Sequence, residues 1–118
     1  MAGFRDLKVW QSSMQLAGDV YRLSAQFPKH ETYGLASQLQ RSAISLPSNI
    51  AEGHGRNTHK EFHHFLGIAL GSLAELETQI LLALQFGYLT EAEINPVLQN
   101  ADEIGKMIKG LQKSLASN

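Results

Sequence analysis

The side chains best suited to chemistry are histidines clustered near the middle of the chain. His59 and His63 are four positions apart, on one face of a predicted helix, and His54 and His64 lie close by. Imidazoles at this spacing can share a metal ion. No HExxH pattern accompanies them. We therefore interpret them as exposed residues at a helix start, and we expect no metal and no other cofactor.

Two glutamates, Glu75 and Glu77, are set among apolar positions of the following segment. A partly buried carboxylate needs a hydrogen-bonding partner, and Arg41, Ser45 or Asn49 on the preceding helix is the expected source. The alternative is an acid/base pair in an active site. No nucleophile or second catalytic group accompanies these glutamates, so the sequence predicts a protein that is not an enzyme.

A polar stripe runs along residues 41–56, RSAISLPSNIAEGHGR. At about 100° per residue, the polar positions fall nearly opposite the apolar ones. They are Arg41, Ser45, Asn49, Glu52 and Arg56. We favour a structural role, in which hydrogen bonds fix the register within a bundle or between subunits. The alternative is a phosphate-contacting surface that uses Arg41, Arg56 and Lys60, which the charge of Glu52 weakens.

Composition limits the class of protein. The chain has 118 residues, 43% of them hydrophobic, which suits one domain spanning 1–118 with a genuine core. It has no cysteine and shows no signal-peptide pattern, so we expect a cytoplasmic protein. Its longest apolar run, Ile80 to Leu84, is far shorter than the roughly 20 residues that span a bilayer. The net charge of −1 does not indicate general nucleic-acid binding.

Apolar periodicity predicts an all-α fold with helices at 4–27, 31–54, 58–87 and 90–115. Thr58 with Glu61, and Thr90 with Glu93, match the capping box that begins a helix. Gly53 and Gly55 are expected to end the second helix, because glycine tolerates the left-handed conformation that closes helices. Short connections between four helices predict an antiparallel, up-down four-helix bundle.

Pro47 falls inside the second predicted helix. Proline removes a backbone donor and its ring clashes with the carbonyl four residues earlier, which costs about 3 kcal/mol. The apolar phase nevertheless runs unbroken from Leu39 to Ile50. We therefore predict one continuous helix that is kinked at Pro47.

Two of the predicted helices carry more apolar surface than one neighbour can cover. In the first, we assign Leu7, Trp10, Met14, Ala17 and Tyr21 to the core, which leaves a second apolar line beside them. An exposed patch of this size favours a symmetric oligomer. The candidate oligomer interface consists of Val9, Leu16, Val20, Phe65, Ile68, Leu82 and Phe86.

Several motifs resemble one family. SLPSNIAEGHGR, the following KEFHHFLGIALGSLAELETQILLALQFGYL, the opening FRDLKVWQ and the segment FPKHETYGLASQLQRSA are similar to the 23S ribosomal RNA intervening-sequence proteins, from about residue 4 to about residue 115. The resemblance implies an up-down four-helix bundle that forms ring-like homopentamers. It implies no settled biochemical function. Some members are encoded inside ribosomal RNA genes, and a related accessory protein of diversity-generating retroelements is a basic pentamer that binds nucleic acid and a reverse transcriptase.

Two functional hypotheses follow. The first is a non-enzymatic homo-oligomeric bundle that acts as an interaction platform and has no membrane contact; the resemblance implies that it is a pentamer. The second is an RNA- or DNA-binding accessory protein associated with ribosomal RNA or a reverse transcriptase. This chain is slightly acidic, unlike the basic retroelement relative. We therefore carry no nucleic-acid-binding residues over from that relative.

Overall fold

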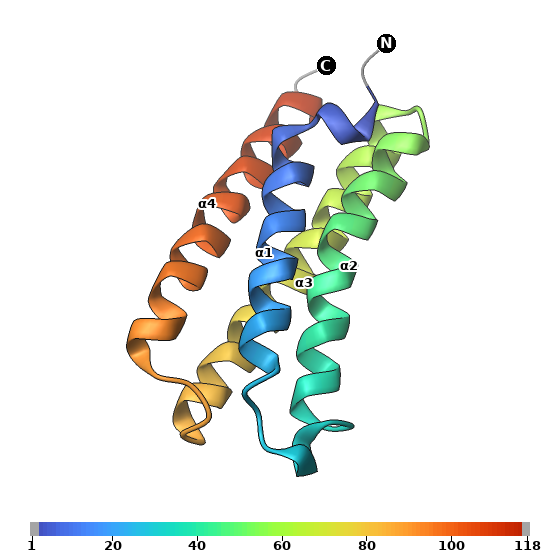
Figure 1. Ribbon diagram of the computed structural model, residues 1–118. Helices are drawn as coiled ribbons and strands as arrows, with labels where there is room; N and C mark the ends of the chain where they lie inside the picture. The colour runs from blue at the N-terminus through green and yellow to red at the C-terminus, as the bar shows by residue number, and fades with distance from the viewer. Residues whose placement is uncertain (1–2, 117–118) are drawn as a thin grey trace.

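The computed structural model describes residues 3–116 and contains four long helices (Figure 1). They are α1 (Lys8–Ser24), α2 (Leu35–Gly55), α3 (His59–Gln85) and α4 (Glu91–Ala116), with short 3-10 helices η1 (Phe4–Asp6) and η2 (Lys29–Glu31). Residues 3–116 contain no strand. The prediction of an all-α, four-helix protein is confirmed.

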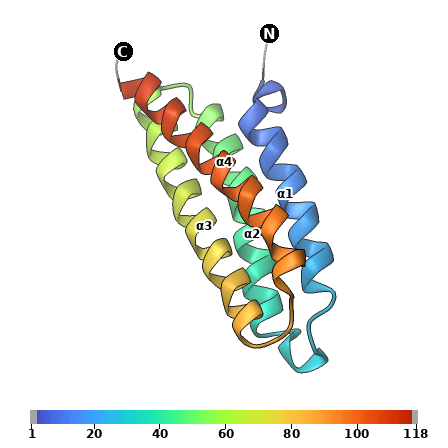
Figure 2. The same ribbon diagram turned by 90° about the vertical axis from the view of Figure 1, so that its left-hand side faces the viewer.

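The four helices form a closed circuit. Each packs against its neighbours in sequence, and α4 returns to pack against α1. The body measures 46 × 23 × 21 Å. The start of η1, the α2–α3 loop and the end of α4 share one end of the bundle, and the other two connections share the opposite end (Figures 1 and 2). The side-chain amide of Gln112, late in α4, donates to the carbonyl of His63, early in α3, at 3.3 Å.

Both predicted capping sites begin helices. The Thr58 hydroxyl accepts the Glu61 backbone N–H at 3.1 Å, which satisfies one orphan donor at the start of α3. At α4 the box is complete: Glu93 N–H donates to the Thr90 hydroxyl at 3.2 Å, and Thr90 N–H donates to the Glu93 carboxylate at 2.9 Å. The Thr90 amide, followed by its hydroxyl, lowers the pKa of Glu93 below its ordinary value.

The second helix is continuous through Pro47, as predicted, and the proline is buried. The kink itself stays a prediction. Of the two glycines predicted to stop this helix, Gly55 is its last residue, whereas Gly53 still lies inside it. The left-handed residue of the loop that follows is Asn57, with φ 67°. Gly53 instead lies where α2 touches Phe65 of α3.

The core assignment for α1 is only partly correct: Leu7, Trp10 and Ala17 pack against the core as partly buried residues, but the rest of the assignment is wrong. Val9, Leu16 and Val20, predicted to be left over for an oligomer, are 5%, 1% and 0% exposed inside the bundle. Met14 and Tyr21, predicted to be in the core, are 48% and 43% exposed. Both apolar lines on α1 are continuous, so periodicity alone could not show which one faces α2 and α4. The aliphatic line is buried, and the line with the bulky sulfur and phenol side chains is left outside.

The third helix, α3, is long and apolar enough to meet a length-and-composition test for a membrane span. The central helix of a soluble bundle meets the same test, because one face must be almost wholly apolar. In α3 that face is buried at Leu66, Leu73, Leu76 and Ile80. Passing this test is therefore only weak evidence against the expectation of no membrane contact. That expectation stays a prediction.

Candidate functional site

The middle of the predicted polar stripe is joined to α3 by hydrogen bonds. The hydroxyls of Ser45 and Ser72 lie 2.8 Å apart across the α2–α3 contact. The Asn49 side-chain amide donates to both the carbonyl and the hydroxyl of Ser45, each at 2.9 Å. One turn away, the Ser42 hydroxyl donates to Gln79 of α3 at 2.9 Å. This part of the stripe fixes the register of two helices, as the structural interpretation expects.

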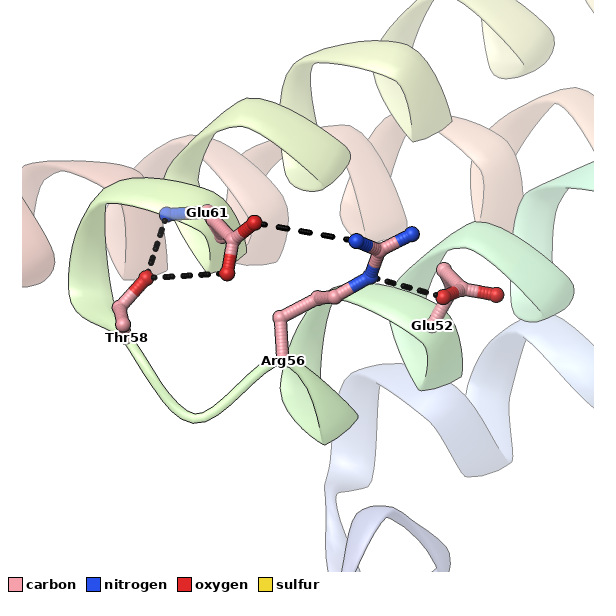
Figure 3. A network of polar contacts seen from close by, with 4 residues as sticks. All are labelled: Glu52, Arg56, Thr58 and Glu61. Atoms are coloured by element: carbon pink, nitrogen blue, oxygen red, sulfur yellow. Dashed lines mark hydrogen bonds and ion pairs between the residues drawn. The ribbon is translucent and has the colours of Figure 1, made fainter.

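The end of the stripe is a charged network at the α2–α3 loop (Figure 3). The guanidinium of Arg56 lies 2.9 Å from the Glu52 carboxylate and 3.8 Å from that of Glu61, and it stacks over the Phe65 ring with 5.0 Å to the centroid. Two carboxylates and a ring therefore share one cation. The two carboxylates offset the positive charge of Arg56, so its attraction for a phosphate is reduced. This weakens the interpretation of the stripe as a phosphate-contacting surface.

Arg41, at the start of the stripe, makes no ion pair with any residue in the described range 3–116 and is exposed. It lines a groove of about 340 Å³ between α2 and α3 together with Ser45 and Glu75. Glu75 therefore lies beside the stripe, as predicted, but within the described residues it makes no hydrogen bond to it. Glu77 instead faces α4, where burial and then the charge of Asp102 raise its pKa above the ordinary value.

Exposed apolar side chains flank the stripe on both sides. On the α1 side, Tyr21 and Ile44, 43% and 51% exposed, line one hollow with Arg41 and Asn49. On the α3 side, Ile68 and Phe86 are 40% and 51% exposed. We call the stripe together with these two apolar rows the three-helix face; its rows consist of Met14, Tyr21 and Ile44 on one side and Phe65, Ile68 and Phe86 on the other.

The predicted interface residues on α3 fit this face better than those on α1. Phe65 and Leu82 are half-buried, and Ile68 and Phe86 are exposed. Ser72, one turn after Ile68, bonds to α2, which places the row beside the stripe. An oligomer interface through these four residues stays a prediction.

One polar cluster escaped sequence reasoning altogether. The Tyr88 hydroxyl donates to the Glu31 carboxylate at 2.8 Å and lies 3.3 Å from the His30 ring, which ties the α1–α2 connection to the α3–α4 connection. The other Glu31 oxygen accepts the Leu35 N–H at 3.0 Å and caps α2. The Leu35 amide and then the Tyr88 hydroxyl lower the pKa of Glu31. The only local signal was a glutamate four residues before the first residue of the helix.

Within residues 3–116, no group of three or more histidine, aspartate or glutamate side chains is placed to hold a metal ion. His59 and His63 are exposed at the start of α3, where they line a hollow with Lys60 and the end of α4. His54 and His64 turn to other rings, namely Phe62 and Phe65.

Comparison with known proteins matches this architecture. The crystal structure of a protein of unknown function from the S23 ribosomal protein family of Bacteroides thetaiotaomicron VPI-5482 has a TM-score of 0.82 to this chain. The identity is 24%, over 89% of this chain and 98% of that one, so the likeness concerns the fold. No curated protein matches. The family model described as 23S rRNA-intervening sequence protein covers residues 5–110. The chain therefore belongs to the family of 23S rRNA-intervening sequence proteins.

Proposed function

We propose that the protein is an antiparallel, up-down bundle that assembles with further copies of itself through the three-helix face and serves as a non-enzymatic interaction platform. The observation that carries the proposal is the arrangement of that face. Large apolar side chains that are 40–51% exposed flank a polar stripe whose central groups are already hydrogen-bonded. Burying such rows removes apolar surface from water at about 25 cal/mol per Å².

The two rows differ in shape and chemistry, which favours a head-to-tail contact. The α1-side row presents a phenol and a thioether, whereas the α3-side row presents Ile68 and two phenylalanines. If the first row of one copy packs on the second row of the next, the copy at each end of a growing chain keeps one free row. Contact between these two free rows can close the assembly into a ring. The family resemblance implies a ring of five subunits, and we adopt that number. Because the chain has no cysteine and so needs no disulfide, we place the assembly in the cytoplasm.

Light scattering on two single variants tests the assembly. Ile44→Glu places a charge in the first row and Ile68→Glu places one in the second. Each is expected to reduce the mass to that of a monomer with its helical circular dichroism intact. Leu81→Glu is the matched control: Leu81 is 49% exposed but lies one turn from Glu77, on the side of α3 that faces α4. It should leave the mass unchanged.

Mixing the two variants then tests the head-to-tail geometry. Ile44→Glu subunits keep an intact second row, and Ile68→Glu subunits keep an intact first row. One native contact can therefore form between them, and the mixture should give heterodimers that grow no further. A mixture that stays monomeric would contradict the head-to-tail contact. Unmodified protein that is monomeric at micromolar concentration would contradict the whole proposal.

A further inference from the structure

Two charged residues near the middle of the three-helix face have no ionic partner among residues 3–116. Arg41 is the only charged residue among positions 37–51 of α2, and Glu75 is the only carboxylate, lysine or arginine among positions 62–76 of α3. Both are exposed, and both line the groove between α2 and α3. Each therefore keeps an uncompensated charge on a face that is otherwise apolar or hydrogen-bonded.

Covering this face makes partners necessary for both charges, because a guanidinium or a carboxylate that leaves water without an opposite charge carries a high desolvation cost. Of the other carboxylates of α1, α2 and α3, three are held by arginines and the fourth faces α4: these are Asp19, Glu52 and Glu61, and Glu77. Glu75 is thus the carboxylate of these three helices that remains available for Arg41.

The two charges lie on opposite halves of the face. Arg41 lines the hollow on the α1 side with Tyr21 and Ile44, which belong to the first apolar row. Glu75 follows Ile68 by seven residues, about two helical turns, and so lies on the same side of α3 as the second row. A contact between the first row of one copy and the second row of the next therefore brings the two charges toward each other.

From this arrangement we infer that Arg41 of one copy forms an ion pair with Glu75 of the next, and that this pair fixes the register of the head-to-tail contact. The inference rests on the proposed assembly through the three-helix face. Copies in a closed ring are related by rotation, so each residue keeps its height along the ring axis. With the bundles standing along that axis, Arg41 is level with the Glu75 of the next copy, because both line one groove within a copy. The apolar rows match in the same register, since Ser45, next to Ile44, touches α3 one turn from Ile68.

The pair contributes more to specificity than to affinity. An ion pair that water still reaches stabilises a contact little, whereas like charges brought together at an interface are strongly unfavourable. Reversing either charge should therefore weaken assembly more than neutralising it. In Arg41→Glu two carboxylates meet at every contact between copies, and in Glu75→Arg two guanidinium groups meet.

Light scattering over a range of protein concentrations tests the pair, with circular dichroism as the check on folding. Each single reversal should raise the concentration at which half of the protein is assembled by at least about tenfold. Arg41→Gln should raise it by less. The matched controls, Lys113→Glu and Glu103→Arg, reverse exposed charges of α4 outside the three-helix face and should leave assembly unchanged.

Mixing the two single reversals separates a pair between copies from a pair inside one copy. Arg41→Glu subunits carry two carboxylates at these positions and Glu75→Arg subunits carry two cations, so opposite charges meet only where the two kinds alternate. The mixture should regain assemblies larger than a dimer, with equal numbers of each kind. Because five is an odd number, these assemblies should be open or even-numbered. A chain that carries both reversals should form the native ring again.

Single reversals that assemble as well as the unmodified protein would overturn the ion pair and leave assembly through the face intact. A mixture that stays monomeric while the doubly reversed chain assembles would place the pair inside one copy and overturn the inference. A mixture that stops at heterodimers would overturn the head-to-tail register. An unmodified protein that is monomeric would instead contradict the proposed assembly itself.

Discussion

Replacing Gly53 with alanine is expected to destabilise the bundle, although alanine is the better helix former. A Cβ atom at this position would lie 2.5 Å from the Phe65 Cβ and 3.1 Å from the Phe62 Cδ1. The closest pair are both Cβ atoms, attached directly to the two backbones, so no side-chain rotation relieves the clash. The helices α2 and α3 would have to separate at the point where the polar stripe and the charged loop network meet.

The magnitude follows from two opposing terms. Overpacking a well-packed contact costs about 1–3 kcal/mol, and a clash between rigid atoms belongs at the upper end. Alanine recovers about 1 kcal/mol of helix propensity relative to glycine. The free energy of unfolding should therefore fall by about 2 kcal/mol.

Urea denaturation followed by circular dichroism, at one fixed protein concentration, measures this change. Gly110→Ala is the matched control, because Gly110 lies inside α4, is exposed and has no atom within 4 Å of its would-be Cβ. It should raise stability by about 0.5–1 kcal/mol. If Gly53→Ala proved as stable as the unmodified protein, the close approach of α2 and α3 would be refuted.

Two further predictions concern pH. Because the Leu35 amide and the Tyr88 hydroxyl lower the pKa of Glu31, the stabilisation that Glu31 gives is present above its unfolded pKa and is lost as the pH falls through the folded one. Tyr88→Phe should flatten this acid loss in melting curves between about pH 7 and pH 3, and an unchanged acid slope would contradict the role of the hydroxyl. Burial and then Asp102 raise the pKa of Glu77, so its carboxyl lowers stability as the pH rises between its unfolded and folded pKa values. Glu77→Gln should therefore raise the melting temperature at neutral pH, and a lower one would contradict this sign.

Local sequence signals predicted local structure well. The capping residues Thr58 and Thr90 begin α3 and α4 because each needs only a partner three residues away. The unbroken apolar period from Leu39 to Ile50 likewise predicted that α2 continues through Pro47, because that period is also a local property of the sequence. Ser45 and Asn49 of the polar stripe also lie where their spacing on one helix places them, although only the structure shows that Ser72 of α3 is the partner of Ser45.

Choices between similar faces were decided by the neighbours. The sequence of α1 offers two continuous apolar lines, and only the positions of α2 and α4 bury Leu16 and expose Met14. Likewise, Gly53 looked like a helix end because glycine tolerates the left-handed backbone. Its actual role depends on the approach of α3, which the local sequence does not contain.

The amino-acid sequence by itself determined four helices, most of their limits and the family, because hydrophobic period and capping act within a few residues along the chain. The tertiary structure alone decided the contacts between distant residues. Glu31 meets Tyr88 across 57 positions, Arg56 is shared between two carboxylates, and Gln112 of α4 bonds to the His63 carbonyl of α3 across 49 positions. Side chains far apart in the sequence become neighbours only through the packing of the helices, so the sequence of any one helix does not contain these contacts.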